Sequence, residues 1–566
     1  MKIQHISPQI INSKNNNKED VRFTGLADGA AIAGSTALRF FDVNQAIGAN
    51  TMDLCTMVLP RTIYDFNNRG PLAGIETGRR ESAGTFNHAM VGVYGTVAGA
   101  ALAYTLRDKF GFNLNHIFAD NNTIDILSNI HHTSVHNNSA DPLRESLNKI
   151  AESITVRNSE ADVETGWVGL NNETKNKFVD KLYDILKNKN IKKLDKESKE
   201  YIYSIVTAST GGEKSVKLSG FGKEAESSLN NMISNIYNVM KSFDSEKVNK
   251  IFENAKDLKA NEFVNSLKKF NKTRAAAGLG FATLFGVSVQ PLNMYLTKKK
   301  TGQDGFVGVP GREKDNSAGF KMQKILAGLA FAAAAISTIT TNPKHLLSKV
   351  QFQGMLPTIN QLKMVYGITI ASRLMSARDK DELRESAVKD TLGFMSLLVL
   401  GSLITKGTAK LLDKSGSLIT MAKNDGQGFF RWMTNSSLKT RDEVLYSALK
   451  KHGISTVKDG KALKFSELMK LLPKDDKLTR VKLRNLNIAQ LVGYAYSAVV
   501  LGFGIPKLND YMTKKNEAKR LAKLAAQNNN QQQASTITND TAQTAAAKSQ
   551  NFTANSIVEK NKFLGA

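Results

Sequence analysis

Uncharged, mostly apolar runs recur five times along the chain and alternate with stretches rich in Lys and Asn. A helix needs about 20 such residues to cross the hydrocarbon core of a bilayer, with a lower limit of about 17. Three of the runs reach that length and two fall slightly short. The pattern predicts membrane-spanning helices at residues 89–106, 275–296, 325–340, 391–405 and 488–506.

Small residues recur at four-residue intervals within the first two runs. They are Gly95, Gly99 and Ala103 in the first run and Gly278, Ala282 and Gly286 in the second. On a helix such residues share one face, where they allow a second backbone to approach closely. We therefore expect these six positions to be helix-packing contacts.

Two shorter apolar segments, residues 26–43 and 46–59, precede the first run and are interrupted by charges. They are typical of interfacial helices or of helices packed inside a bundle. Asp53 lies in the second segment and allows two interpretations. An acid at membrane depth is costly and usually functional, whereas an acid on an interfacial helix faces water. The shortness of the segment favours the water-facing interpretation, and Asp53 stays a candidate intramembrane acid.

The stretch from residue 110 to 271 is polar, and its apolar residues recur at helical spacing, as in Leu229, Met232, Ile233 and Ile236. This pattern predicts a soluble helical domain. We expect amphipathic helices near residues 141–157, 173–188, 196–208, 222–243 and 246–271. The Gly- and Ser-rich residues 207–222 are expected to form a flexible linker.

Residues 412–485 are polar again. A helix is predicted at 441–452, and the turn residues Lys458-Asp459-Gly460-Lys461 predict a small β-hairpin. The fold class expected from all these patterns is all-α: a multi-pass helical membrane protein with an inserted soluble helical domain, a small peripheral lobe and disordered tails. The expected domains are a tail (1–22), membrane-associated helices (26–109), the soluble helical domain (110–271), membrane helices (275–411), an α+β lobe (412–485), the last membrane helix with its basic extension (488–526) and a low-complexity tail (527–566).

Composition adds a strong positive charge, with 77 Lys and Arg residues against 51 Asp and Glu residues and a net charge of +26. Basic residues that flank membrane helices explain such an excess and favour anionic lipids as partners. Nucleic acid is not an expected partner, because the charge is spread out and no stacking motif accompanies it. A single cysteine, Cys55, excludes an intramolecular disulfide, and its apolar surroundings predict a buried thiol. The N-terminus lacks the apolar core of a cleavable signal peptide.

Catalytic motifs are not found: the sequence contains no phosphate-binding loop, nucleophile elbow or HExxH pair. It therefore predicts no catalytic residue, no cofactor-binding residue and no cofactor, and the chain is not expected to be an enzyme. The weak metal-ligand candidates are His131, His132 and His136, of which the last two have the spacing of one helix face. Their Asn- and Ser-rich surroundings favour a loop instead.

The tetrapeptide Arg-Glu-Ser-Ala occurs at residues 80–83 and 384–387, in each case ahead of an apolar run. Helix capping and ion pairing explain these residues without a function, and a charged collar at the membrane edge is the functional alternative. An internal duplication is a further hypothesis. A third Arg-Glu-Ser at residues 144–146 opens a polar helix and weakens it.

The function predicted from these observations is a multi-pass integral membrane protein, either a scaffold or a channel- or transporter-like body. Its expected location is a membrane, most simply a bacterial inner membrane, and its expected partners are the lipid bilayer and unknown proteins. Two alternatives stay open. One is a soluble all-α assembly protein with buried Ala- and Gly-rich helices, which the mean hydropathy of −0.28 favours. The other is a secreted, membrane-inserting protein of the pore-forming or translocator type.

Overall fold

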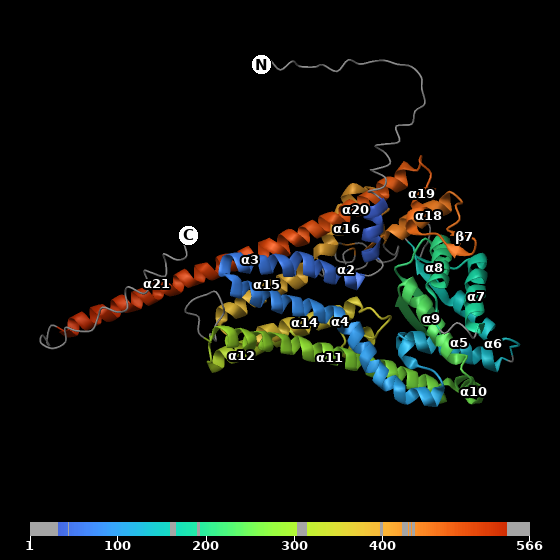
Figure 1. Cartoon of the computed structure of the whole chain (residues 1–566), viewed down its shortest axis with the longest axis horizontal. Coiled ribbons are helices and arrows are strands. Elements are labelled where there is room, and N and C mark those ends of the chain that lie inside the picture. The colour runs from blue at the N-terminus through green and yellow to red at the C-terminus, as the bar shows by residue number, and fades with distance from the viewer. Residues whose placement is uncertain are drawn as a thin grey trace, which may run out of the picture. The chain divides into compact units, whose positions relative to one another are not determined.

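The computed structural model is mostly helical and describes residues 32–42, 45–137, 139–158, 166–188, 193–302, 314–396, 400–420, 428, 432 and 436–539. The described residues up to Pro506 belong to one compact unit, and residues from Lys507 onward belong to a second. The first unit contains a set of long helices, a small α+β domain inserted between two of them, and a polar lobe (Figure 1).

The long helices and the short segments between them form what we call the helical body. It contains α2 (Gln45–Met52), η1 (Asp53–Val58), α3 (Leu59–Arg69), α4 (Pro71–Phe110), α11 (Glu262–Thr301), α12 (Ala318–Ser337), α14 (Ile359–Met375), α15 (Lys380–Met395), α16 (Gly401–Leu412), α20 (Lys477–Ser497) and η6 (Ala498–Gly504). The segments η1 and η6 are π-helical. Short connectors are η2 (Leu114–His116), η3 (Leu258–Ala260), η4 (Pro343–His345) and α13 (Leu346–Lys349).

Helices α4 and α11, each 40 residues long, pack against each other along much of their length. Small residues allow this contact: a Cβ added to Gly278 would lie 2.8 Å from the Cα of Gly95. Near its end α4 also packs in the inserted domain. Ala103 and Phe110 belong to the apolar core of that domain together with Phe263 of α11, whose ring contacts Phe110.

Four helical stretches are long and apolar enough to cross a membrane: α4, α11, α12 and residues 477–522. The described part of the chain shows no such helix for the predicted span 391–405. There α15 ends at Met395 and α16 begins at Gly401, with residues 397–399 outside the described set.

The inserted domain is not purely helical, which corrects the expectation for residues 110–271. Its helices are α5 (Asn121–His136), α6 (Pro142–Ser153), α7 (Asn172–Lys187), α8 (Lys196–Thr210), α9 (Leu229–Phe243) and α10 (Glu246–Asn254). The domain also contains an antiparallel sheet of order β2-β1-β3-β4, built from β1 (Ile154–Arg157), β2 (Trp167–Gly169), β3 (Val216–Gly220) and β4 (Lys223–Ser227). Buried residues alternate along β1 and β3, so one face of the sheet packs in the core.

The residues expected to form a flexible linker, 207–222, contain strand β3 of this sheet. Val216 and Leu218 are fully buried, so the alternation of apolar and polar residues outweighs the Gly and Ser content. Phe221 and Gly222 both have positive φ angles, as the two central residues of a type I′ hairpin turn require. The linker prediction was therefore wrong.

The polar lobe confirms the local predictions for residues 441–465. Helix α18 (Arg441–Lys451) is followed by Gly453 at φ 66°. Strands β7 (Val457–Lys458) and β8 (Lys461–Ala462) pair across Asp459 and Gly460, whose φ angles are 51° and 73°. Helix α19 (Phe465–Leu471) and the pair β5 (Ile419–Thr420) and β6 (Ser437–Leu438) complete the described lobe.

Both predicted tails lie largely outside the described residues. This holds for residues 1–22 and for residues 540–566. Residues 527–539, expected to be disordered, form the last turns of α21 (Ile505–Asn539). Gln and Ala are good helix formers, which explains how the helix extends into a sequence of low complexity.

Candidate functional site: a buried charge network

The helical body has an inverted distribution of polarity. Large apolar side chains lie on its surface, including Leu284 at 67% exposure, Val97 at 64% and Leu326 at 58%. Charged side chains lie inside, among them Arg61, Glu81 and Arg373. An isolated charge is expensive to bury, so a cluster of buried charges must be mutually compensated. The interior network is therefore the first place to look for a functional site.

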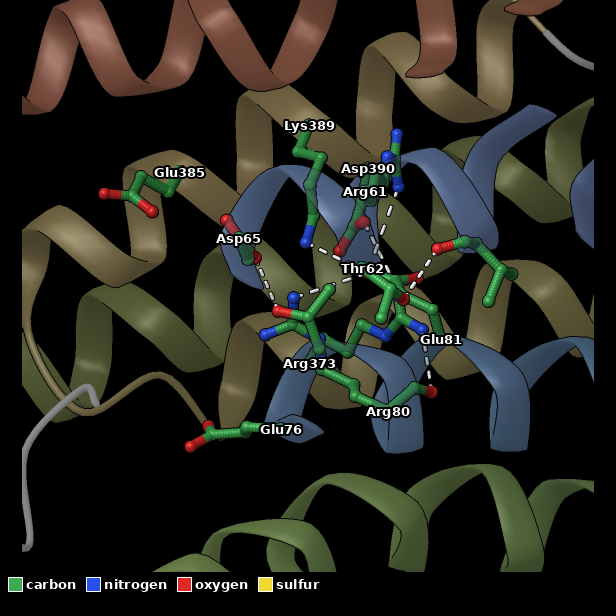
Figure 2. A network of polar contacts seen from close by, with 12 residues as sticks. Arg61, Thr62, Asp65, Glu76, Arg80, Glu81, Arg373, Glu385, Lys389 and Asp390 are labelled. Atoms are coloured by element: carbon green, nitrogen blue, oxygen red, sulfur yellow. Dashed lines mark hydrogen bonds and ion pairs between the residues drawn. The ribbon is translucent and has the colours of Figure 1, made fainter. Parts of the chain in front are cut away.

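Glu81 is the centre of this network and is 1% exposed. Its carboxylate lies 2.9 Å from Nη1 of Arg373, 3.0 Å from Nζ of Lys389 and 3.3 Å from Nη2 of Arg80. Nη1 of Arg61 is 3.9 Å away. Figure 2 shows these side chains converging from α3, α4, α14 and α15. One carboxylate thus faces four cationic groups.

Two further acids extend the network around Glu81. Asp390 lies 3.2 Å from Nη1 of Arg373. Asp53, at the start of η1, accepts a hydrogen bond from Thr85, which lies one helical turn after Glu81. We call the group Asp53, Arg61, Arg80, Glu81, Arg373, Lys389 and Asp390 the charged core. Asp53 is 2% exposed and does not face water, unlike the interpretation that its short segment favoured.

The two π-helical segments meet beside the charged core. A Cβ added to Gly502 in η6 would lie 2.9 Å from the carbonyl oxygen of Thr56 in η1. Nε of Arg61 donates to the carbonyl of Leu501, also in η6, at 3.3 Å. π-helical turns inside longer helices are rare and occur often at functional sites, because they redirect backbone carbonyls and side chains.

A second set of ion pairs lies near the turns that join α3 to α4 and α14 to α15. Arg378 bridges Glu76 and Glu382 at 2.9 Å each. Arg69 lies 3.3 Å from Glu385. Since Arg378 belongs to one turn and Glu76 follows the other closely, both turns lie at the same end of the helical body.

Two of the ion pairs that link the α3–α4 hairpin to the α14–α15 hairpin are reciprocal. Arg373 of the second hairpin binds Glu81 of the first, and Arg69 of the first binds Glu385 of the second. Glu81 follows Arg69 by 12 residues, and Glu385 follows Arg373 by the same 12 residues. Equal spacing and exchanged partners are what an internal two-fold relation would produce, and they favour the duplication hypothesis.

The capping interpretation of the Arg-Glu-Ser-Ala segments is wrong for the first copy. Helix α4 begins at Pro71, so Arg80 and Glu81 lie well inside it and are buried. The third copy differs in kind, because Arg144 pairs with Asp180 on the exposed surface of the inserted domain. Burial, and not the tetrapeptide, distinguishes the copies.

The predicted packing residues lie at several different contacts. Gly95 and Gly278 face each other beside Phe352, and Gly99 lies against Arg274. On α11, the carbonyl of Ala282 accepts a hydrogen bond from Asn87, and Gly286 lies near Thr369. Ala103 packs in the core of the inserted domain.

Cys55 was expected to be buried, but its side chain is exposed.

The three histidines lie on helix α5 and not in a loop. His131 contacts Ser146, His132 contacts the carbonyl of Ala255, and His136 contacts the carbonyl of His132. Within the described residues no three His, Cys, Asp or Glu side chains are grouped to hold a metal ion. These contacts give the histidines a structural role in the inserted domain.

Another buried acidic group joins the inserted domain to the lobe. Glu213 accepts a hydrogen bond from Thr440 at 2.5 Å and lies near Asp442 and Glu443. Burial, together with these two neighbouring carboxylates, raises the pKa of Glu213 well above its ordinary value. Burial also raises the pKa of Asp442, although Arg39 lies 2.6 Å from it.

Sequence reasoning missed most of the charged core. Arg61, Arg373, Lys389 and Asp390 interrupt or flank apolar segments and were not predicted as site residues. That interruption was itself the available signal, because charges inside apolar helices face the interior of a bundle.

Comparison with known protein families, with curated proteins and with solved structures finds no match for this chain.

Proposed function

We propose that the helical body is a membrane-embedded body of the channel or transporter type, whose charged core handles a small charged solute. The observation that carries the proposal is the inverted polarity: exposed Leu, Val and Phe outside and a compensated charge network inside. In water such a surface would be costly, at about 25 cal/mol for each Å² of exposed apolar area. In lipid the same surface is solvated.

The depth of the charged core supports the proposal. Asn87 donates to the carbonyl of Ala282 at 2.8 Å, and Asn293 donates to the carbonyl of Glu76 at 3.2 Å. Glu81 lies between Glu76 and Asn87 on α4, so it is level with the uncharged run of α11. Ionisable groups at that depth are costly and usually mark a solute or ion pathway.

The ends of α11 fit the same arrangement. Exposed lysines flank the uncharged run: Lys272 precedes it, and Lys298, Lys299 and Lys300 follow it. Basic residues at both ends anchor a helix at the headgroups and favour anionic lipids. A bacterial inner membrane is the proposed location. The proposal includes no catalytic chemistry and no cofactor.

The two alternatives make different demands on the same surface. A soluble assembly protein would need a partner that covers the apolar faces of α4, α11 and α12. A secreted membrane-inserting protein would hide these faces before insertion. A membrane-embedded body needs neither a covering partner nor a hidden state, because lipid covers these faces.

The test begins with expression of the full chain and extraction of the membrane fraction with alkaline carbonate. We expect the protein to stay in the pellet and to need detergent for a monodisperse product. A protein that is soluble without detergent would contradict the proposal. Purified protein in liposomes should then release trapped potassium chloride faster than empty liposomes. Absence of release would contradict the channel or transporter type and leave a scaffold.

A further inference from the structure

We infer that the charged core is a binding site for a small monovalent anion, with Arg61 as its principal ligand and the Glu81 carboxylate as an internal competitor. This inference rests on the proposed function and names the class of solute. The chemistry it requires is that of chloride or an anion of similar size.

Arg61 is the first reason for this inference. It is 2% exposed, and its Nε donates to the carbonyl of Leu501. Neither Nη1 nor Nη2 has a hydrogen-bond partner within the described part of the chain. The Glu81 carboxylate, 3.9 Å from Nη1, is too distant for a hydrogen bond. A buried guanidinium with two unmatched terminal nitrogens can bind an acceptor, since leaving its donors unpaired is costly.

The surroundings of Glu81 are the second reason. Arg61, Arg80, Arg373 and Lys389 all lie within 4 Å of its carboxylate. Asp390 compensates Arg373, and Asp53 is engaged with Thr85. A site where four cations face one flexible carboxylate will also attract a free anion. The side chain of Glu81 has three rotatable bonds, so its carboxylate can move aside when an anion takes its place.

The walls of the site leave little room, which limits the ligand to a small ion. A Cβ added to Gly393 would lie 3.3 Å from Nη2 of Arg61. A Cβ added to Gly84 would lie 3.1 Å from Nη2 of Arg373. Glycine at both positions lets the two guanidinium groups lie against helix backbones. The enclosed charges suit a monovalent anion, because a polyvalent one would require more desolvation.

The test measures thermal unfolding of the full-length protein in detergent, in sodium chloride and in sodium gluconate of equal ionic strength. Gluconate is too large for the site. We expect the midpoint of the wild-type protein to rise saturably as chloride replaces gluconate, by at least about 3 °C. Arg61→Gln should abolish this rise. Equal midpoints in the two salts, or an undiminished rise in Arg61→Gln, would overturn the inference.

Two further variants separate binding from folding. Glu81→Gln removes the competing charge and should lower the half-saturating chloride concentration about tenfold. Arg61→Lys keeps the charge but loses the paired donors, and should raise the half-saturating chloride concentration about tenfold. This variant also tests the inference if Arg61→Gln does not fold. An unchanged value in both variants contradicts the inference.

Glu385→Gln is the matched control, because Glu385 holds the corresponding place in the second hairpin and pairs with Arg69. It should respond to chloride as the wild-type protein does. The outcomes separate the two proposals. A protein that resists carbonate but ignores chloride keeps its membrane assignment and loses the anion site. A protein that carbonate extracts loses the membrane assignment, whatever its response to chloride.

Discussion

The role of each buried charged residue depends on whether neighbouring groups compensate its charge and satisfy its hydrogen bonds. Arg373 has two carboxylates within 3.2 Å, whereas both terminal nitrogens of Arg61 lack a hydrogen-bond partner among the described residues. The first arrangement is structural, since removing either partner would leave an uncompensated charge. The second leaves binding capacity, and for this reason Arg61 and not Arg373 is the proposed ligand.

His131 carries a prediction at the residue scale, outside the membrane proposal. It is buried and stacks on Phe243 with ring centroids 4.9 Å apart. Burial, with a smaller effect of His132, lowers the pKa of His131 to about 4. The unfolded chain therefore binds the proton near pH 6.5, while the folded domain does not. Stability of the inserted domain should fall as pH decreases from 6.5 to 4, by about 3 kcal/mol.

Hydrogen exchange of the α5 amides in the full-length protein measures this effect. Protection should decrease between pH 7 and pH 4.5, after correction for the intrinsic exchange rate. His131→Asn should remove most of that pH dependence at some cost in stability at neutral pH. His132→Asn is the control, because His132 is only partly buried. Equal pH dependence in wild type and His131→Asn would contradict the prediction.

At the scale of elements, the contact between α4 and α11 depends on glycines from both helices. A larger side chain at Gly278 must displace the backbone of α4, because its Cβ would lie 2.9 Å from the amide nitrogen of Gly95. Gly278→Leu should destabilise the protein by about 1–3 kcal/mol, which is the typical cost of overpacking a well-packed core.

The measurement is the thermal midpoint in detergent. Gly280→Leu is a matched control on the same helix, since nothing lies within 4 Å of a Cβ at that position. It should leave the midpoint nearly unchanged. If both substitutions lower the midpoint equally, loss of glycine and not the helix contact is the cause.

The element scale also shows what local patterns can predict. The type I′ hairpin at Asp459 and Gly460 and the amphipathic helix α9 follow from turn chemistry and periodicity within one segment. Strand β3 was missed because Gly and Ser residues surround a short apolar alternation. That strand pairs with β4 across the adjacent turn and with β1, which comes from an earlier part of the chain.

At the scale of the whole molecule, the helical body and the inserted domain have opposite surfaces. The inserted domain buries its large apolar residues, as Ile233 and Phe252 show. The helical body exposes many of its own, including Leu284 on α11 and Leu326 on α12. The proposed location satisfies both surfaces, because it places lipid around the helical body and water around the inserted domain.

Site-directed labelling tests this arrangement in a Cys55→Ala background, which removes the single native thiol. Cysteines replace Leu284 on the helical body or Lys458 on the lobe. In membranes opened by freezing and thawing, a charged maleimide should label the cysteine at position 458 and not the one at position 284. Both should react after denaturation in SDS. Labelling of position 284 in native membranes would contradict lipid contact there.

The apolar runs, the amphipathic helices and the local turns could be predicted from the sequence alone, because they depend on periodicity and conformational preference within about 20 residues. Tertiary structure decided which charges meet. Glu81 finds Arg373 and Lys389 about 300 residues away, and ion pairs carry no periodic signal that would reveal such partners in advance. Tertiary structure also decided that the end of the α4 apolar run packs in the inserted domain, since an apolar face is satisfied equally by lipid or by a protein core.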